Sequence, residues 1–229
     1  MTSHLDVVFL DVGGPIYDDR AYYESLLRAI REEEPSVTHE AFDREYEACR
    51  LRQDGSFRRH IIPALLGPDA DIERVARNAE ATWDYPPDSL LPDVVPALEA
   101  LTAAGYRLAV LANQPARTRQ TLERDGLDRY FSLYSISEEL GYEKPDPRIF
   151  AHAVEQAGVD PASAVMVGDR LDNDIRPAQA AGMKAVWLLR GEAPEEPTPE
   201  QVAEPDACIR SLAELPAALA ALTPYRGST

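Results

Sequence analysis

The chain has 229 residues, of which 45% are hydrophobic and 28% charged, a composition typical of globular proteins. Its formal net charge of −17 argues against nucleic acid or an anionic membrane surface as a partner, because both are negatively charged. Its two cysteines, Cys49 and Cys208, are too few for a disulfide framework, and no apolar run approaches the ~20 residues that span a bilayer. Since no signal peptide is recognisable either, we expect a cytoplasmic protein. The sequence indicates no particular oligomeric state.

The stretch 5–19, LDVVFLDVGGPIYDD, predicts a buried strand that ends at an acidic residue. An apolar run over 7–10 is followed at once by Asp11 and by a Gly-Gly-Pro turn over 13–15. A strand that is apolar on both faces is typical of the centre of a parallel sheet. Asp11 would then stand at the carboxyl end of the strand, where open α/β sheets bind ligands. The alternative is an aspartate that only stabilises the turn.

The residues that follow show helical periodicity, with no strand signal between Asp18 and Leu90. Thr38 is a plausible N-cap of one of these helices. Helices are expected over 20–31, 38–52, 56–66 and 71–83. We therefore expect residues 17–92 to form an inserted all-helical domain.

Strands and helices alternate through the rest of the chain. Strands are expected over 107–112, 133–137, 164–167 and 185–189, and helices over 93–104, 116–125, 147–157 and 175–181. A surface loop over 191–206, an edge strand at 208–209 and a helix over 211–222, disturbed by Pro216, complete the prediction. This alternation indicates βαβ units. The expected fold class is α/β: a Rossmann-like, three-layer core with a parallel sheet, formed by residues 1–16 and 93–229.

Polar and charged side chains follow the predicted strands, and in a parallel sheet they all lie at one edge. They are Asp11, Asn113, Lys144, Asp169, Asp172 and Asp174. Clustered carboxylates repel each other and favour a cation, and all-oxygen ligands suit Mg²⁺. Lys144 stands out because this arginine-rich chain has only one other lysine, Lys184. A compact ammonium is not interchangeable with a guanidinium at a crowded site.

These segments resemble the motifs of the haloacid dehalogenase-like hydrolases, in the branch with a helical cap of the C1 type inserted after the first motif. Asp11 after its strand, LAVLAN at 108–113, GYEKPDPRIF at 141–150 and VMVGDRLDNDI at 165–175 occur in the family's order and spacing. The resemblance covers nearly the whole chain. It implies a hydrolase, most directly one that acts on a small phosphorylated, anionic metabolite.

The resemblance also implies roles for individual residues. Asp11 would be the nucleophile that forms an aspartyl-phosphate, and Lys144 would hold Asp11 and the phosphoryl oxygens. Asn113 would belong to the same catalytic set. Mg²⁺ would be bound by Asp11, the backbone carbonyl of Gly13 and Asp169, with support from Asp174. An anion that attacks an anion needs such a cation between them.

Three positions depart from the family's phosphatases. Gly13 replaces the second aspartate, which serves as general acid and base, while Pro15 and Ala112 replace hydroxyl residues. Alternatives therefore remain open: a dehalogenase, a phosphonate-cleaving enzyme, or a binding protein on a degenerate enzyme fold. Dehalogenases do not need the metal, so Asp169 and Asp174 speak against that alternative. The phosphonate-cleaving relatives use a cap lysine, and residues 17–92 contain none.

The missing acid predicts a preference among phosphate esters. Aryl and acyl phosphates, whose leaving groups depart as stable anions, are expected to react faster than alkyl phosphates. His60 or Tyr17 could instead supply the proton.

A basic run in the helical segment offers candidate contacts to the substrate. It comprises Arg50, Arg52, Arg58, Arg59 and His60 around Gly55. One interpretation is a solvated helix face. The other is that Arg58, Arg59 or His60, together with Arg20 or Tyr17, reaches an anionic group of the substrate.

Overall fold

The computed structural model describes residues 4–223 and contains one six-stranded sheet in which every strand pair is parallel. The predicted core segments also include residues 1–3 and 224–229, which lie outside the described residues. The strand order is β3-β2-β1-β4-β5-β6. The strands are β1 (Val7–Leu10), β2 (Arg107–Ala112), β3 (Phe131–Ile136), β4 (Ala164–Gly168), β5 (Lys184–Leu188) and β6 (Ala207–Ile209). The prediction that the first strand is central is therefore confirmed.

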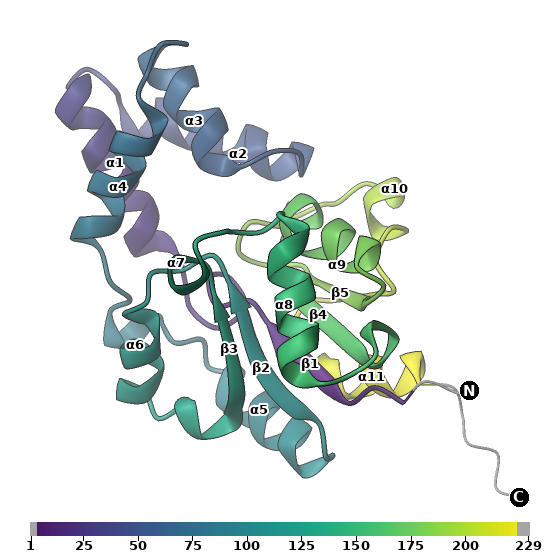
Figure 1. Cartoon of the computed structure of the whole chain (residues 1–229). Coiled ribbons are helices and arrows are strands. Elements are labelled where there is room, and N and C mark those ends of the chain that lie inside the picture. Colours follow the sequence, from purple (N-terminus) through teal and green to yellow (C-terminus); the bar gives the residue numbers. More distant parts are fainter. Residues whose placement is uncertain (1–3, 224–229) are drawn as a thin grey trace, which may run out of the picture.

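Helices cover both faces of this sheet (Figure 1), which confirms the predicted three-layer α/β fold. Alternate residues of β1 point to opposite faces, with Val8 and Leu10 on one and Val7 and Phe9 on the other. The first face packs against α5 (Val94–Ala103), α6 (Thr118–Arg124) and α11 (Leu215–Leu222), and the second against α8 (Pro147–Ala157) and α9 (Arg176–Ala180). Both layers exclude water from the strands, so the sheet is a rigid platform for residues at its edges.

Four helices form a separate group beside the carboxyl edge of the sheet (Figure 1), here termed the helical unit. They are α1 (Arg20–Glu33), α2 (His39–Arg52), α3 (Phe57–Leu66) and α4 (Ile72–Thr82). Leu26, Phe42, Ile61 and Val75, one from each helix, belong to an apolar cluster that is distinct from the two clusters of the sheet. The four predicted helices are thus confirmed, with ends within two residues of the prediction.

Two chain segments connect the helical unit to the sheet, and they lie side by side. Asp18 N–H donates to Ser89 O at 2.9 Å, and Leu91 N–H donates to Ile16 O at 3.0 Å. Tyr17 forms an isolated antiparallel bridge with Leu90 between these bonds. The chain therefore leaves and re-enters the core at one point, here termed the junction.

The predicted division at residues 17 and 92 remains a prediction. Tyr17, Trp83 and Tyr85 pack with the apolar cluster of the sheet, although all three lie within the range predicted for the inserted domain.

Several local predictions were wrong. The stretch 191–206 contains a short helix, α10 (Pro199–Val202), which begins with a capping box formed by Thr198 and Gln201. The predicted helix over 175–181 is present as α9, but the π-helical turn η4 (Leu171–Ile175) directly before it was not predicted. Pro216 does not disturb the last helix, because it lies in its first turn, where proline fits.

Further short elements complete the fold. They are η1 (Pro87–Ser89), η2 (Asp128–Tyr130), α7 (Ser137–Leu140), η3 (Pro161–Ser163) and η5 (Leu212–Glu214). Within residues 4–223, no helix is long and apolar enough to cross a membrane.

Candidate active site

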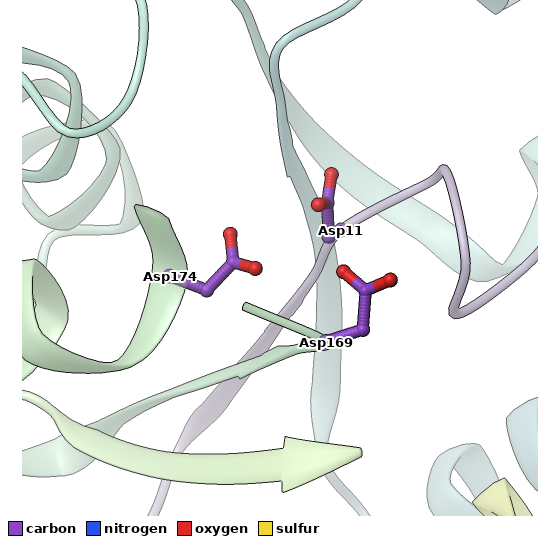
Figure 2. Close-up of side chains that lie close together, drawn as sticks. All are labelled: Asp11, Asp169 and Asp174. Atoms are coloured by element: carbon purple, nitrogen blue, oxygen red, sulfur yellow. The ribbon is translucent and has the colours of Figure 1, made fainter. Parts of the chain in front are cut away.

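Three carboxylates converge at the carboxyl edge of the sheet (Figure 2). Asp11 directly follows β1, Asp169 directly follows β4, and Asp174 lies in the π-helical turn η4. One carboxylate oxygen from each lies within 4.8 Å of the other two. Adjacent parallel strands place their ends together, so β1 and β4 bring Asp11 and Asp169 into one site, as the sequence predicted.

Lys144 lies between two of these carboxylates. Its Nζ is 3.0 Å from Asp11 Oδ2 and 2.6 Å from Asp174 Oδ1, and the Lys144 and Asp174 side chains are fully buried. Although burial disfavours the charged ammonium, Asp11 and Asp174 together raise the pKa of Lys144. The lysine is therefore held as a cation at a fixed point beside the candidate nucleophile.

The cluster still carries more negative charge than one lysine offsets. Burial raises the pKa of Asp11 to about 6, against the attraction of Lys144. Burial raises the pKa of Asp169 well above its usual range, and the neighbouring carboxylates of Glu192, Asp174 and Asp11 add to this rise. These carboxylates could hold a divalent cation, and an all-oxygen donor set fits Mg²⁺.

Asn113 positions the backbone of Lys144. Its Nδ2 donates to Lys144 O at 2.8 Å, and its Oδ1 accepts from Lys144 N–H at 2.7 Å. These two bonds fix the segment after β3 against the end of β2. The Asn113 side chain lines the cleft, but its contacts to Lys144 are through the backbone.

Two glycines allow Asp169 to lie where it does. A Cβ on Gly14 would lie 2.1 Å from Asp169 Oδ2, and a Cβ on Gly191 would lie 2.2 Å from the same atom. Both have positive φ angles, 80° and 60°, which glycine adopts freely. Glu192 N–H donates to Asp169 Oδ2 at 2.7 Å. The carboxylate is thus enclosed by backbone on two sides, with its position closely fixed.

A cleft of about 840 Å³ opens above the cluster, between the sheet edge and the helical unit. Asp11, Gly13, Asn113, Lys144 and Asp169 line its floor. Its carboxylates outnumber its four basic side chains, which are Arg58, Arg59, Lys144 and Arg170. The volume suits a small metabolite.

The turn between α2 and α3 closes one side of this cleft against the core. The Gln53 side chain accepts from Leu171 N–H at 2.9 Å and donates to Glu192 O at 2.7 Å. The backbone of Gln53 adopts a left-handed conformation with φ of 50°. These bonds tie the helical unit to the loops that follow β4 and β5.

The predicted substrate contacts fall into two groups. Arg58 and Arg59 line the cleft; Arg58 is paired with Glu80 and with Glu143, whereas Arg59 forms an exposed pair with Glu73 at 3.0 Å. The other three residues point elsewhere. The exposed Arg20 pairs with Asp18, His60 lies 3.4 Å from Glu45, and the buried Tyr17 hydroxyl donates to Asp125 at 2.9 Å.

Sequence reasoning missed Asp19 and Glu192, which also line the cleft. Burial raises the pKa of Asp19 well above its usual range, although a hydrogen bond from Tyr85 opposes this rise. Glu192 accepts from Tyr23 Oη at 3.0 Å and from Arg170 Nη1 at 2.5 Å. Neither position carries a family motif. Asp19 has the sequence context of an ordinary helix N-cap, and Glu192 lies in a stretch rich in glutamate and proline.

The fold and this site define a class of protein: an α/β enzyme with a carboxylate at the end of its central strand and a buried lysine beside it. Residues 5–182 match the model of the haloacid dehalogenase-like hydrolase family. The chain therefore belongs to this family and is a hydrolase, as its motifs predicted.

Two relatives that are similar over most of this chain are named as phosphatases. A glyceraldehyde 3-phosphate phosphatase of Methanopyrus kandleri is 34% identical over 199 residues, which are 82% of this chain and 85% of that protein. A phosphoserine phosphatase of Thermus thermophilus is 39% identical over 167 residues, 70% of this chain and 64% of that protein.

Solved structures agree on the fold. A phosphatase of this family from Thermococcus onnurineus superposes with a TM-score of 0.63 at 26% identity, covering 93% of this chain and 97% of the other. A 2-haloacid dehalogenase from Pseudomonas syringae has a TM-score of 0.60 at 29% identity, covering 95% of this chain and 99% of the other. Both kinds of chemistry therefore occur on closely similar folds.

Proposed function

We propose that this hydrolase is a Mg²⁺-dependent phosphatase that acts on small phosphate monoesters, with the helical unit as its cap. The observation that carries this proposal is the convergence of Asp11, Asp169 and Asp174 around Lys144. Three converging carboxylates favour a bound cation, which phosphoryl transfer uses and dehalogenation does not need. The names of the two phosphatase relatives support the same reaction class, and because their substrates differ, the proposal extends to the class of phosphate monoesters.

Asp11 would act as the nucleophile. A carboxylate oxygen attacks phosphorus, an O–P bond forms, and the ester P–O bond breaks to release the alcohol. Water then attacks the phosphorus of the aspartyl-phosphate, which releases inorganic phosphate and restores Asp11. Lys144, 3.0 Å from Asp11 Oδ2, offsets negative charge in both steps.

Mg²⁺ would be held by Asp11 and Asp169, with Asp174 supporting it, and would supply charge neutralisation between the nucleophile and the phosphoryl group. Asp169 is prepared for this role by the two glycines that enclose it and by the Glu192 N–H that orients it. Asp174 is oriented by Lys144 Nζ and by Arg170 N–H, which donates at 3.0 Å.

The helical unit would close over the substrate and exclude water, as lids of this kind do. Arg59 is the candidate contact for a distal part of the substrate, because its ion pair with Glu73 is exposed and a ligand can replace it. Arg58 is held between Glu80 and Glu143 and would connect the helical unit to the core.

The test is release of inorganic phosphate from a panel of aryl, acyl and alkyl phosphates, with and without Mg²⁺, by the unmodified protein and by Asp11→Asn. We expect release that requires Mg²⁺ and is abolished in the variant. Halide release from 2-chloropropionate, or cleavage of a phosphonate, in the absence of phosphatase activity would instead assign one of the alternative chemistries. A protein that cleaves none of these compounds would contradict the proposal.

A further inference from the structure

The structure shows what occupies the space of the side chain that Gly13 lacks. A Cβ built on Gly13 would lie 2.5 Å from Asp19 Oδ2 and 2.7 Å from Asp19 Oδ1. The carboxylate of Asp19 therefore fills the position in which a side chain on residue 13 would begin. Asp19 and Gly13 both line the cleft, together with the candidate nucleophile Asp11.

The Asp19 side chain is held in this position by the core. Its Oδ1 accepts a hydrogen bond from Tyr85 Oη at 2.8 Å, and Tyr85 Oη in turn accepts from Gln114 Nε2 at 3.1 Å. Tyr85 is itself only 1% exposed and stacks on Tyr17 with ring centroids 4.5 Å apart. In the described part of the chain, no hydrogen bond reaches Asp19 Oδ2, so this oxygen is available to a bound molecule.

The Asp19 side chain does not cap the helix that follows it. It is the N-cap residue of α1, yet its side chain makes no capping hydrogen bond. Asp71 and Asp146, at the N-termini of α4 and α8, do accept from backbone N–H groups. An N-cap aspartate usually contributes about 1 kcal/mol of stability in that way. The Asp19 carboxylate instead faces the space above Gly13.

We propose that Asp19 is the catalytic acid and base of this enzyme and replaces, from the start of α1, the acid that the first motif lacks. The inference rests on the proposed phosphatase function. As the ester P–O bond breaks, Asp19 gives its proton to the leaving oxygen and the alcohol departs neutral. In the second step the Asp19 carboxylate accepts a proton from the attacking water, which returns the enzyme to its starting state.

The other two candidate donors are engaged elsewhere. The Tyr17 hydroxyl donates to Asp125 from a fully buried position, and His60 lies beside Glu45. Neither residue lines the cleft. The absence of a side chain on Gly13 led to the expectation that the enzyme lacks an acid and favours aryl and acyl phosphates. With Asp19 as the acid, that preference is no longer expected.

The test compares kcat across phosphate esters whose leaving groups differ in pKa. General acid catalysis typically contributes ~10²–10⁴-fold, and it matters most for poor leaving groups. For the unmodified protein we expect log kcat to depend only weakly on the pKa of the leaving group. For Asp19→Asn we expect a loss of about 10²-fold or more on alkyl phosphates and of less than about tenfold on aryl and acyl phosphates. Asp71→Asn removes a carboxylate from another helix N-terminus and should leave kcat unchanged on both alkyl phosphates and aryl or acyl phosphates.

A rescue variant makes the test specific to the shared space. Gly13→Asp alone should be poorly active, because its side chain collides with Asp19. The φ angle of Gly13 does not lie in the left-handed region, so a residue with a side chain can adopt the same backbone conformation. The double variant Gly13→Asp/Asp19→Ala should therefore regain alkyl phosphate hydrolysis relative to Asp19→Ala. Thermal unfolding of each variant establishes that it is folded.

An equal loss of rate on all leaving groups in folded Asp19→Asn would overturn the assignment and leave the phosphatase proposal intact. A steep fall of kcat with rising leaving-group pKa in the unmodified protein would overturn the assignment as well. Absence of phosphate release from every ester by the unmodified protein would instead refute the proposed function.

Discussion

Gly14→Ala tests whether the position of Asp169 controls the site. Gly14 has φ of 80°, and a Cβ there would lie 2.1 Å from Asp169 Oδ2, whereas ordinary contact begins at 3.4 Å. The carboxylate must therefore move by more than an ångström. Gly105→Ala is the matched control, because Gly105 has φ of 88° and nothing within 4 Å of its Cβ position.

Both substitutions place a side chain at a left-handed backbone position, but only Gly14→Ala also crowds Asp169. An alanine in the left-handed region costs about 1–2 kcal/mol in either place. Crowding against Asp169 adds about 1–3 kcal/mol in Gly14→Ala only. At ~2–4 °C per kcal/mol for chains of this size, the control should lose about 2–8 °C in Tm and Gly14→Ala about 4–20 °C.

Activity separates the variants more sharply than stability. A displacement of about 1 Å at a reacting group can lower the rate by ~10²-fold, so we expect that loss in kcat for phosphate release by Gly14→Ala. Gly105→Ala should stay within about twofold of the unmodified protein, because its site geometry is unchanged. The assays are thermal unfolding and phosphate release at saturating Mg²⁺. If Gly14→Ala loses no more activity than Gly105→Ala, the enclosure of Asp169 by glycine has no catalytic importance.

Three further substitutions test individual side chains. Lys144→Met leaves two buried carboxylates without their cation and should cost about 3–5 kcal/mol in urea unfolding, whereas Lys184→Met breaks only a partly exposed ion pair and should cost less than about 1 kcal/mol. Equal costs for the two lysines would contradict the buried bridge. Tyr17→Phe should lose about 1 kcal/mol of stability with unchanged KM, because its hydroxyl bonds to the core rather than to a ligand; a raised KM would return it to the substrate site. Arg59→Ala should raise KM for at least one substrate, whereas Arg20→Ala should leave the kinetics unchanged, and the opposite result would relocate the distal contact.

The sheet and its edge could be predicted from the sequence because local patterns determine them. An apolar run such as 7–10, closed by Asp11 and a glycine-rich turn, has few alternatives to a central strand. Parallel strands then bring Asp11 and Asp169 together whatever the loops do, and the motif around Lys144 predicted its place beside Asp11. The helices of the inserted segment were predictable for the same reason, since periodicity alone defines them.

The upper part of the site could not be predicted in this way. Asp19 and Tyr17 are two residues apart. Tyr17 packs against Tyr85 and bonds to Asp125, whereas Asp19 is the one that lines the cleft, and these tertiary contacts have no signal in the sequence. Glu192 is brought to the site by hydrogen bonds to Tyr23 and Arg170, which are distant in the sequence. The α10 helix was missed because its capping box lies in a segment whose proline content predicted a loop.

The junction has a consequence for how this enzyme can evolve. The chain enters the helical unit beside Ile16 and leaves it beside Leu91, and a single hydrogen bond of 3.0 Å joins these residues. Because the two ends of the helical unit lie together, the length and sequence of the unit can change during evolution without straining the sheet or shifting the register of its strands. Selection can therefore reshape the roof of the cleft for a new metabolite by mutation, or exchange the whole insert by recombination. The reacting groups at the ends of β1 and β4 are inherited unchanged, but Asp19 lies just inside the exchanged segment. A lineage that replaced this insert would have to recover the acid, and position 13 is where a single codon change could provide it.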